Sequence, residues 1–310
     1  MTNKNEHLNC VLESLKMGNV DDLMTKYKKK REEVKEALDK KYNSKKETSP
    51  INSGSYAKHT AINTKFDIDI CIPFKRDSFD TLEEMANDVY DYFENEYEDD
   101  ELDYVREQRV STGLNFIIDG DDIDMDIVPG RAIKGEIYSD TFNLKLYVRA
   151  KDGKPATETK TNIKKHIDLI SGKNAERDII RLLKRWKHSH NKKYKSFFIE
   201  LITIKAFENK KDNIPNGIWE KLKMVMEFIK DNVETISLKD PANSNNIVSD
   251  TLTSSKKTSL SNDMKKMLKE IDDNSDNIKH YFEINDEFPC KSNNMNKNEG
   301  ATTLGTKSFG

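Results

Sequence analysis

One short segment constrains the fold more than any other, because it places two acids inside an apolar run. Residues 66–73 read FDIDICIP, so Asp67 and Asp69 alternate with isoleucines. Alternate residues of a strand project from one face, about 7 Å apart along the strand. The pattern predicts a strand from Asp67 to Phe74 whose isoleucines lie in a core while both carboxylates point to one place.

A second acid pair lies further along the chain, in residues 122–129, which read DIDMDIVP. The turn signal DGDD before Asp124 and Asp126 predicts that this strand pairs with the preceding one, VSTGLNFIID. If the two acid-bearing strands are neighbours, three or four carboxylates converge, and like charges so close require cations. Hard divalent ions, Mg²⁺ above all, suit oxygen ligands, and a pair of such ions is the usual apparatus of phosphoryl transfer.

Gly54 and Ser55 precede the first strand and fit the same chemistry. A glycine lets backbone N–H groups approach an anion closely, and a serine hydroxyl can donate to a phosphate oxygen. Each signal alone has an ordinary explanation, because Gly-Ser pairs are common in loops and alternating acids are common on solvated strand edges. The combination is hard to obtain from surface patterning.

Composition limits the other possibilities. Lys+Arg 52 and Asp+Glu 55 give a formal net charge of only -3, so no global polyanion-binding signal follows. Cys10, Cys71 and Cys290 are far apart and lack C-x-x-C spacing, which argues against a zinc site and against disulfides, and favours a reducing cytosol. The N-terminus lacks a signal-peptide core, and no segment approaches the roughly 18 apolar residues of a membrane span. We expect a cytoplasmic protein.

The periodicity predicts an α+β fold of two lobes with a cleft between them. Residues 1–155 should form a lobe with a mixed sheet and a long spine helix from Val20 to about Tyr42. Residues 156–288 should form a helical lobe, in which SFFIELITIKAF is apolar nearly all round and therefore buried. Residues 289–310 have the composition of a flexible tail. The lysines of the spine helix are expected to be a solvated surface, with a nucleic-acid face as the alternative.

These motifs resemble a known family. Residues 54–56, Thr60, residues 67–69 and residues 126–129 look like the nucleotidyltransferase signature of the cGAS/DncV-like enzymes, the bacterial CD-NTases of anti-phage CBASS systems, which are related to oligoadenylate synthetases. RLLKRWK, KSFFIELITIKAF and SLKDPANSNN resemble the helical domain of that superfamily. The likeness covers about residues 5–285. It implies a polymerase-β-like nucleotidyltransferase lobe followed by an oligoadenylate-synthetase-like helical lobe.

The resemblance assigns metal ligands to three acids. Asp67 and Asp69 would hold two Mg²⁺ ions, for which Mn²⁺ can substitute, and Asp126 would complete the triad and orient the acceptor hydroxyl for deprotonation. Asp124 is the competitor for that third role. The family places its acid immediately before the apolar-Val-Pro step, which favours Asp126.

The resemblance also assigns nucleotide contacts, which are Gly54, Ser55, Tyr56, Lys184, Ser196 and Phe197. Ser55, Lys184 and Ser196 would contact phosphates, and Phe197 would stack on a base. Lys184 could instead be an ordinary surface lysine and Phe197 an ordinary core aromatic. Trp186 is expected to pack between the lobes, and His188 to lie at the surface rather than in a metal site.

The function implied is a synthase that joins nucleoside triphosphates, ATP or GTP or both, into a cyclic di- or trinucleotide second messenger and releases pyrophosphate. The alternatives are a linear oligoadenylate synthetase, an RNA terminal nucleotidyltransferase, and an inactive nucleotide-binding or toxin-antitoxin module. No Cys/His zinc insertion is present, so DNA is not the expected activator. The tail ends in Gly310, which a ubiquitin-like E1/E2 enzyme could conjugate to a target; an ordinary disordered terminus is the other interpretation.

Overall fold

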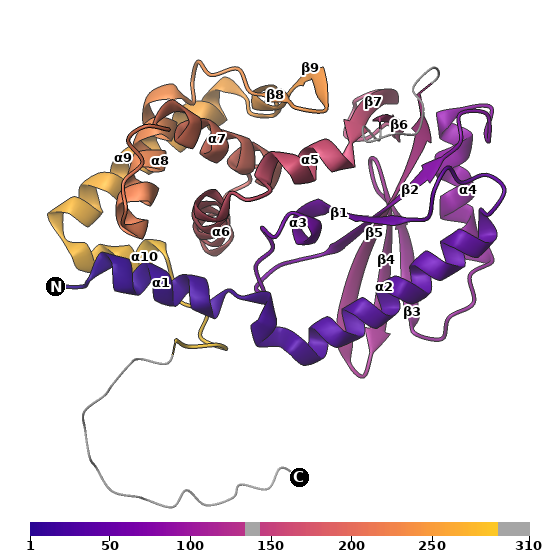
Figure 1. Cartoon of the computed structure of the whole chain (residues 1–310), viewed down its shortest axis with the longest axis horizontal. Coiled ribbons are helices and arrows are strands. Elements are labelled where there is room, and N and C mark those ends of the chain that lie inside the picture. The colour runs from indigo at the N-terminus through magenta and orange to yellow at the C-terminus, as the bar shows by residue number, and fades with distance from the viewer. Residues whose placement is uncertain (134–142, 291–310) are drawn as a thin grey trace, which may run out of the picture.

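A computed structural model of the chain describes residues 1–133 and 143–290. Figure 1 shows two lobes side by side, one built around a sheet and one built from helices. The architecture is α+β, as predicted. Of the predicted flexible tail, residues 289–310, the part from 291 on, with Gly310, lies outside the described residues.

The sheet lobe contains a mixed sheet of seven strands within the described residues. Five strands run in the spatial order β1-β2-β5-β4-β3, and β6 and β7 extend the sheet from the end of β5. The β2–β5 pair is parallel and the other pairs are antiparallel. The strands are β1 (Ile51–Ser53), β2 (Ile68–Phe74), β3 (Leu102–Glu107), β4 (Thr112–Ile118), β5 (Asp121–Ala132), β6 (Asn143–Val148) and β7 (Thr157–Asn162).

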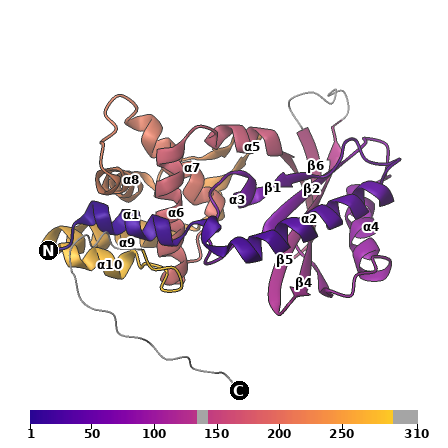
Figure 2. The same cartoon turned by 60° about the horizontal axis from the view of Figure 1, so that its bottom comes forward.

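Two long helices, α2 (Asp21–Lys41) and α4 (Leu82–Asn95), pack with this sheet (Figures 1 and 2). Ile68, Ile70 and Ile72 of β2 are fully buried in the same core as the apolar stripes of both helices. The prediction that the isoleucines anchor this strand is confirmed. Burying three such side chains contributes on the order of 5 kcal/mol or more, which fixes where the acids of this segment point.

The helical lobe has one large core, with a small separate cluster formed by Ile170, Ile180 and Ile204. Its central helix is α7, which is buried on nearly all sides, as the sequence predicted. Trp186 is 1% exposed in this core. The helices of this lobe are α1 (Lys4–Ser14), α5 (Ile163–Ile170), α6 (Asn174–Ser189), α7 (Ser196–Asn209), α8 (Ile218–Asn232), α9 (Ser254–Asp273) and α10 (Ile278–Tyr281). A small hairpin joins α8 to α9 and consists of β8 (Lys239–Asp240) and β9 (Asn243–Ile247).

The first helix, α1, packs in the helical lobe although it begins the chain. Leu8 and Val11 of α1, and Leu15 directly after it, are fully buried in the helical core. The chain then crosses to the sheet lobe through a short 3₁₀ turn (Met17–Val20) and enters α2. The helical lobe is therefore assembled from both ends of the chain.

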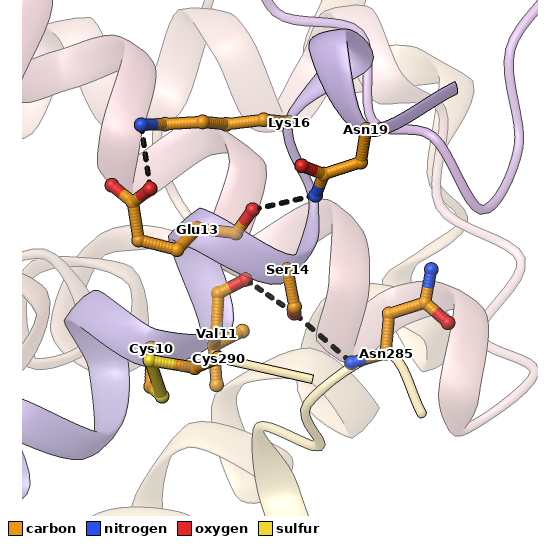
Figure 3. Close-up of a disulfide and its surroundings, with 8 residues drawn as sticks. All are labelled: Cys10, Val11, Glu13, Ser14, Lys16, Asn19, Asn285 and Cys290. Carbon is orange, nitrogen blue, oxygen red and sulfur yellow. Dashed lines mark hydrogen bonds and ion pairs between the residues drawn. A yellow bond between two sulfur atoms is a disulfide. The ribbon is translucent and has the colours of Figure 1, made fainter. Parts of the chain in front are cut away.

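The prediction against disulfides is wrong, because Cys10 and Cys290 are bonded to each other (Figure 3). They are 280 residues apart in sequence, with 5.2 Å between their Cα atoms. The segment after α10 returns to α1, where the backbone N–H of Asn285 donates to the Ser14 hydroxyl at 3.0 Å. Spacing along the chain gave no sign of this return. Cys71 is a free, buried thiol.

The described residues form no helix that is both long enough and apolar enough to cross a membrane.

Candidate active site

The two acid-bearing strands are direct neighbours. β2 and β5 pair in parallel, and Asp69 stands opposite Asp126 in their register. Asp67 immediately precedes β2, on the same side of the strand as Asp69. The sequence predicted that the carboxylates would converge if these strands were neighbours. The strands are neighbours, and Asp67, Asp69 and Asp126 lie together.

The electrostatics of these acids show uncompensated negative charge. Burial, together with the charges of Asp67 and Asp126, raises the pKa of Asp69 to about 7. Burial and then Asp67 raise the pKa of Asp126 to about 6. Lys58 and Lys184 pull the pKa of Asp69 downward, but they do not offset the burial and the neighbouring carboxylates.

This donor set fits divalent metal ions. Its members offer hard oxygen atoms, and a cation between them would relieve both the burial and the repulsion. Gln108 holds Asp126 from the side, because its Nε2 donates to Asp126 Oδ1 at 2.7 Å. That hydrogen bond leaves Oδ2 of Asp126 to face the other acids or a ligand.

Asp124 has a hydrogen-bond donor and a cation beside it. Asn115 Nδ2 donates to its Oδ1 at 3.3 Å, and an Arg106 nitrogen lies 3.7 Å from the same oxygen. These contacts do not decide which of the two acids is the third metal ligand. The strand register favours Asp126 over Asp124, because Asp126 stands directly opposite Asp69.

A tighter group of acids occurs elsewhere, at Glu33, Asp99 and Glu101, whose oxygens lie within 4.8 Å of one another. Lys30 Nζ contacts all three carboxylates, at 2.8, 2.8 and 2.6 Å. A lysine ammonium thus fills the place that a metal ion would take.

Gly54 packs directly against Asp69. A Cβ on Gly54 would lie 1.6 Å from Asp69 Oδ2, and its φ of +67° belongs to the left-handed region that favours glycine. The close approach places the backbone after Gly54, with Ser55, beside the acids. Tyr56 instead packs against the core of the sheet lobe.

A cavity of about 590 Å³ opens between the two lobes at these residues. Ser55 and Asp67 line it from the sheet lobe, and Lys184 and Ser196 line it from the helical lobe. The predicted cleft is thus present, and four of the predicted site residues face it. The predicted site residues outside this lining are Gly54, Tyr56, Asp69, Asp126 and Phe197, whereas Asp124, the competitor of Asp126, belongs to it.

Lys184 is 4% exposed, so it is not the ordinary surface lysine of the alternative interpretation. Its Nζ donates to the backbone oxygen and the hydroxyl of Thr60, at 3.0 Å each, and lies 3.1 Å from Glu200 Oε1. Lys58 Nζ contacts the other Glu200 oxygen at 2.5 Å. These four residues form a buried ionic bridge between the lobes, here called the lobe bridge.

Glu200 and Lys58 are the members of this bridge that the sequence reasoning missed. Glu200 is the one that left a signal in the sequence. It is 4% exposed, and both lysines lower its pKa despite its burial. The signal was available, because Glu200 is an isolated acid in the apolar helix SFFIELITIKAF. A lone charge at such a position is buried only when it is paired.

Ser196 is the first residue of α7, and the residue before it, Lys195, gives the helix no side-chain cap. The dipole of this 14-residue helix therefore points its positive end toward the cleft. Lys187 Nζ donates to the Ser196 hydroxyl at 3.0 Å. Both features suit an anion at Ser196.

Phe197 is partly buried against the helical core and also contacts polar groups. The His166 ring lies 5.0 Å away, and Lys58 Nζ lies 5.3 Å from the ring centre. His166 in turn bonds the buried Asp240, with Nε2 2.7 Å from Oδ1. The sequence reasoning gave no role to His166 or to Asp240, although Asp240 lies in SLKDPANSNN, one of the motifs that resemble the helical domain of the superfamily.

Comparison with known proteins identifies a family match over more than half of the chain. Residues 1–174 match the family described as Second Messenger Oligonucleotide or Dinucleotide Synthetase domain. No curated protein sequence matches the chain.

Solved structures share the fold. CdnC of E. coli MS115-1 with ATP superposes with a TM-score of 0.65 at 20% identity, covering 87% of this chain and 90% of that chain. CdnC in a complex with HORMA-deltaN gives 0.62 at 21% identity, covering 83% and 86%. The Vibrio cholerae cyclic AMP-GMP synthase DncV, a prokaryotic cGAS homologue, gives 0.55 at 12% identity, covering 79% and 72%.

Proposed function

The chain belongs to the family of Second Messenger Oligonucleotide or Dinucleotide Synthetase domains, and we propose that it uses Asp67, Asp69 and Asp126 to join nucleoside triphosphates into a cyclic di- or trinucleotide. The family makes it a nucleotidyltransferase that synthesises second messengers. A role in anti-phage signalling is what that family implies. The bases joined, the linkage and the ring size are set by the cleft rather than by the acids.

One observation carries the proposal, which is the register of Asp69 with Asp126 on adjacent parallel strands. The two carboxylates and Asp67 form a site for two divalent ions, Mg²⁺ with Mn²⁺ as a substitute. When bound, the ions would activate the attacking hydroxyl and stabilise the leaving pyrophosphate. The raised pKa values of Asp69 and Asp126 support this assignment, because burial and the neighbouring carboxylates disfavour their charged forms, and a bound divalent cation would favour those forms.

The reaction forms one bond and breaks one bond. A ribose hydroxyl oxygen of the acceptor forms a new bond to the α-phosphorus of the donor, and the bond from that phosphorus to the bridging β-phosphate oxygen breaks. Pyrophosphate leaves with the electron pair, and the hydroxyl gives up its proton. Asp126 is suited to orient that hydroxyl and accept its proton at Oδ2, because Gln108 already holds Oδ1.

The donor phosphates would lie on the helical-lobe wall of the cleft. Ser55 follows the close Gly54–Asp69 contact, and Ser196 begins α7 opposite it. Lys184 lies between them and would offer its charge. Phe197, beside His166, would stack on the donor base. Tyr56 packs against the core of the sheet lobe, on the other side of the cleft.

Direct product analysis tests the proposal. The purified chain is incubated with each labelled nucleoside triphosphate and with pairs of them, with Mg²⁺ or Mn²⁺, then treated with phosphatase and examined by mass spectrometry. A phosphatase-resistant product from the wild type that is absent from Asp67→Ala/Asp69→Ala supports the synthase. Asp100→Ala/Asp103→Ala is the matched control, because it removes two exposed acids of the sheet lobe and should keep activity.

The same experiment separates the alternatives. A ladder of linear products would indicate an oligoadenylate-type synthetase instead of a cyclic-nucleotide synthase. Extension of an added RNA would indicate a terminal nucleotidyltransferase. No product under any condition would leave an inactive nucleotide-binding module.

Two kinds of protein partner follow as proposals. The match to CdnC in complex with HORMA-deltaN favours a folded protein of that kind as a regulator. Gly310 is the proposed site for conjugation by an E1/E2-like enzyme. Removing residues 291–310 should abolish conjugation and leave nucleotide synthesis intact; loss of synthesis would contradict the tail proposal.

A further inference from the structure

A strongly basic groove lies next to the catalytic cleft. Its cavity is about 530 Å³ and is formed by the end of α6, the connection from α6 to α7 and the loop before β2. No acid belongs to its described lining. Its cationic residues are Lys65, Arg185, Lys187, Lys192, Lys193 and Lys195.

Most of these cations have no acid to balance them. Arg185 pairs with Glu283 at 3.5 Å and Lys192 with Asp263 at 2.7 Å. Lys65, Lys187, Lys193 and Lys195 form no ion pair with a described residue. The net charge of the whole chain is -3, so this positive charge is concentrated locally in the groove. It creates a field that attracts anions.

The groove and the catalytic cleft are continuous, because Lys65, Lys187 and His188 line both. Lys187 also bonds Ser196 at the uncapped start of α7. The shared wall is thus the phosphate end of the cleft rather than the end at the acids. Burial and the surrounding cations, Lys187 and Lys65 among them, hold the pKa of His188 at about 4, which is consistent with that field.

The groove lacks a surface for stacking a base. Its tyrosine, Tyr194, is 6% exposed and already stacks on Trp186, with ring centres 6.2 Å apart. The imidazole of His188 also lines the groove, but it is half-buried. Single-stranded nucleic acids need exposed rings as well as charge. Charge without a free ring favours an anion made of phosphates alone.

We propose that this groove is a binding site for a short chain of phosphates, and that in the synthase it receives the pyrophosphate released from the cleft. The role for the released product rests on the proposed function; the phosphate site itself rests on the groove. Two sources share the chemistry, namely free pyrophosphate and the terminal phosphates of an incoming nucleotide.

Calorimetric titration of the full chain with inorganic pyrophosphate, in EDTA and low salt, tests the site without turnover. Lys193→Gln/Lys195→Gln should weaken binding about tenfold, since each exposed charge contributes modestly. Lys28→Gln/Lys29→Gln, an equal change of charge on exposed residues of α2, should bind as the wild type does. Asp67→Asn/Asp69→Asn should bind as tightly or more tightly. Unfolding temperatures confirm that each variant folds.

Unchanged affinity in Lys193→Gln/Lys195→Gln would overturn the proposal, and so would loss of binding in Asp67→Asn/Asp69→Asn. Repeating the titration with ATP identifies which phosphate the groove binds. If Lys193→Gln/Lys195→Gln weakens the binding of pyrophosphate alone, the groove binds the released product. If it weakens the binding of pyrophosphate and ATP equally, the groove binds the phosphates of the nucleotide. Either result supports a phosphate site. If the wild type makes no nucleotide product, the proposed function fails while this binding result stands.

Discussion

Replacing Gly54 by alanine should separate catalysis from folding. The new Cβ would lie 1.6 Å from Asp69 Oδ2 and 2.3 Å from its Cγ, whereas real Cβ contacts are essentially never under 3.0 Å. The carboxylate must therefore move by at least about 1.4 Å. A misplacement of about 1 Å can cost on the order of 100-fold in rate, so Gly54→Ala should lose at least that much activity.

The backbone cost of this change is small and can be matched. An L-residue in the left-handed region costs about 1–2 kcal/mol. Gly153 has a φ of +73°, close to the +67° of Gly54, and a Cβ there meets nothing within 4 Å. Gly153→Ala therefore carries the same backbone strain without the clash, and should keep full activity.

Pyrophosphate release and urea unfolding, measured on both variants and the wild type, provide the assay. Both variants should lose about 1–2 kcal/mol of unfolding free energy, with only Gly54→Ala losing activity. Near-normal activity of Gly54→Ala would refute the claim that Asp69 must stay where it is. Equal loss of activity in Gly153→Ala would show that strain, rather than the displaced carboxylate, is responsible.

Three further predictions concern stability. In EDTA, wild-type unfolding free energy should fall as pH rises from 3.8 toward about 7, because folded Asp69 holds its proton there and the unfolded residue does not; Asp69→Asn should show less of this slope in urea titrations. Glu200→Gln should lower the unfolding free energy by about 3 kcal/mol, because it leaves buried lysines without their acid. Glu208→Gln, whose ion pair is exposed, should lower it by less than about 1 kcal/mol. Similar losses for the two variants would contradict a buried bridge. Cys290→Ser should lower the unfolding temperature without affecting synthesis, as reductant should in the wild type; no change with reductant would argue against the disulfide.

The strand carrying Asp67 and Asp69 was predictable because its signal is local. Side chains alternate with a period of two, so burial of the isoleucines decides which way the acids face. The pairing of β2 with β5 was a different matter. This pairing joins segments that are separated in the chain by a helix and two strands. The sequence could not predict it, and the expected convergence of the acids depended on it.

The features that sequence reasoning missed depend on distant contacts. Cys10 and Cys290 meet only because the chain returns to α1 after α10. The basic groove combines residues from two lobes, while the net charge of -3 averages over the whole chain and hides it. Neither spacing nor composition reports which surfaces fold against each other.

If Lys184 contacts a donor phosphate, as proposed, the lobe bridge would couple nucleotide binding to the packing of the two lobes. A lysine ammonium has three donors, and those of Lys184 are directed to the two Thr60 oxygens and to Glu200. A phosphate can gain a hydrogen bond from Lys184 only if one of these contacts is released. The Thr60 hydroxyl is the contact most easily given up, because it also donates to Glu200 at 3.0 Å and so remains bonded. A donor phosphate would then share Lys184 with Glu200, and the bridge between the lobes would loosen without breaking.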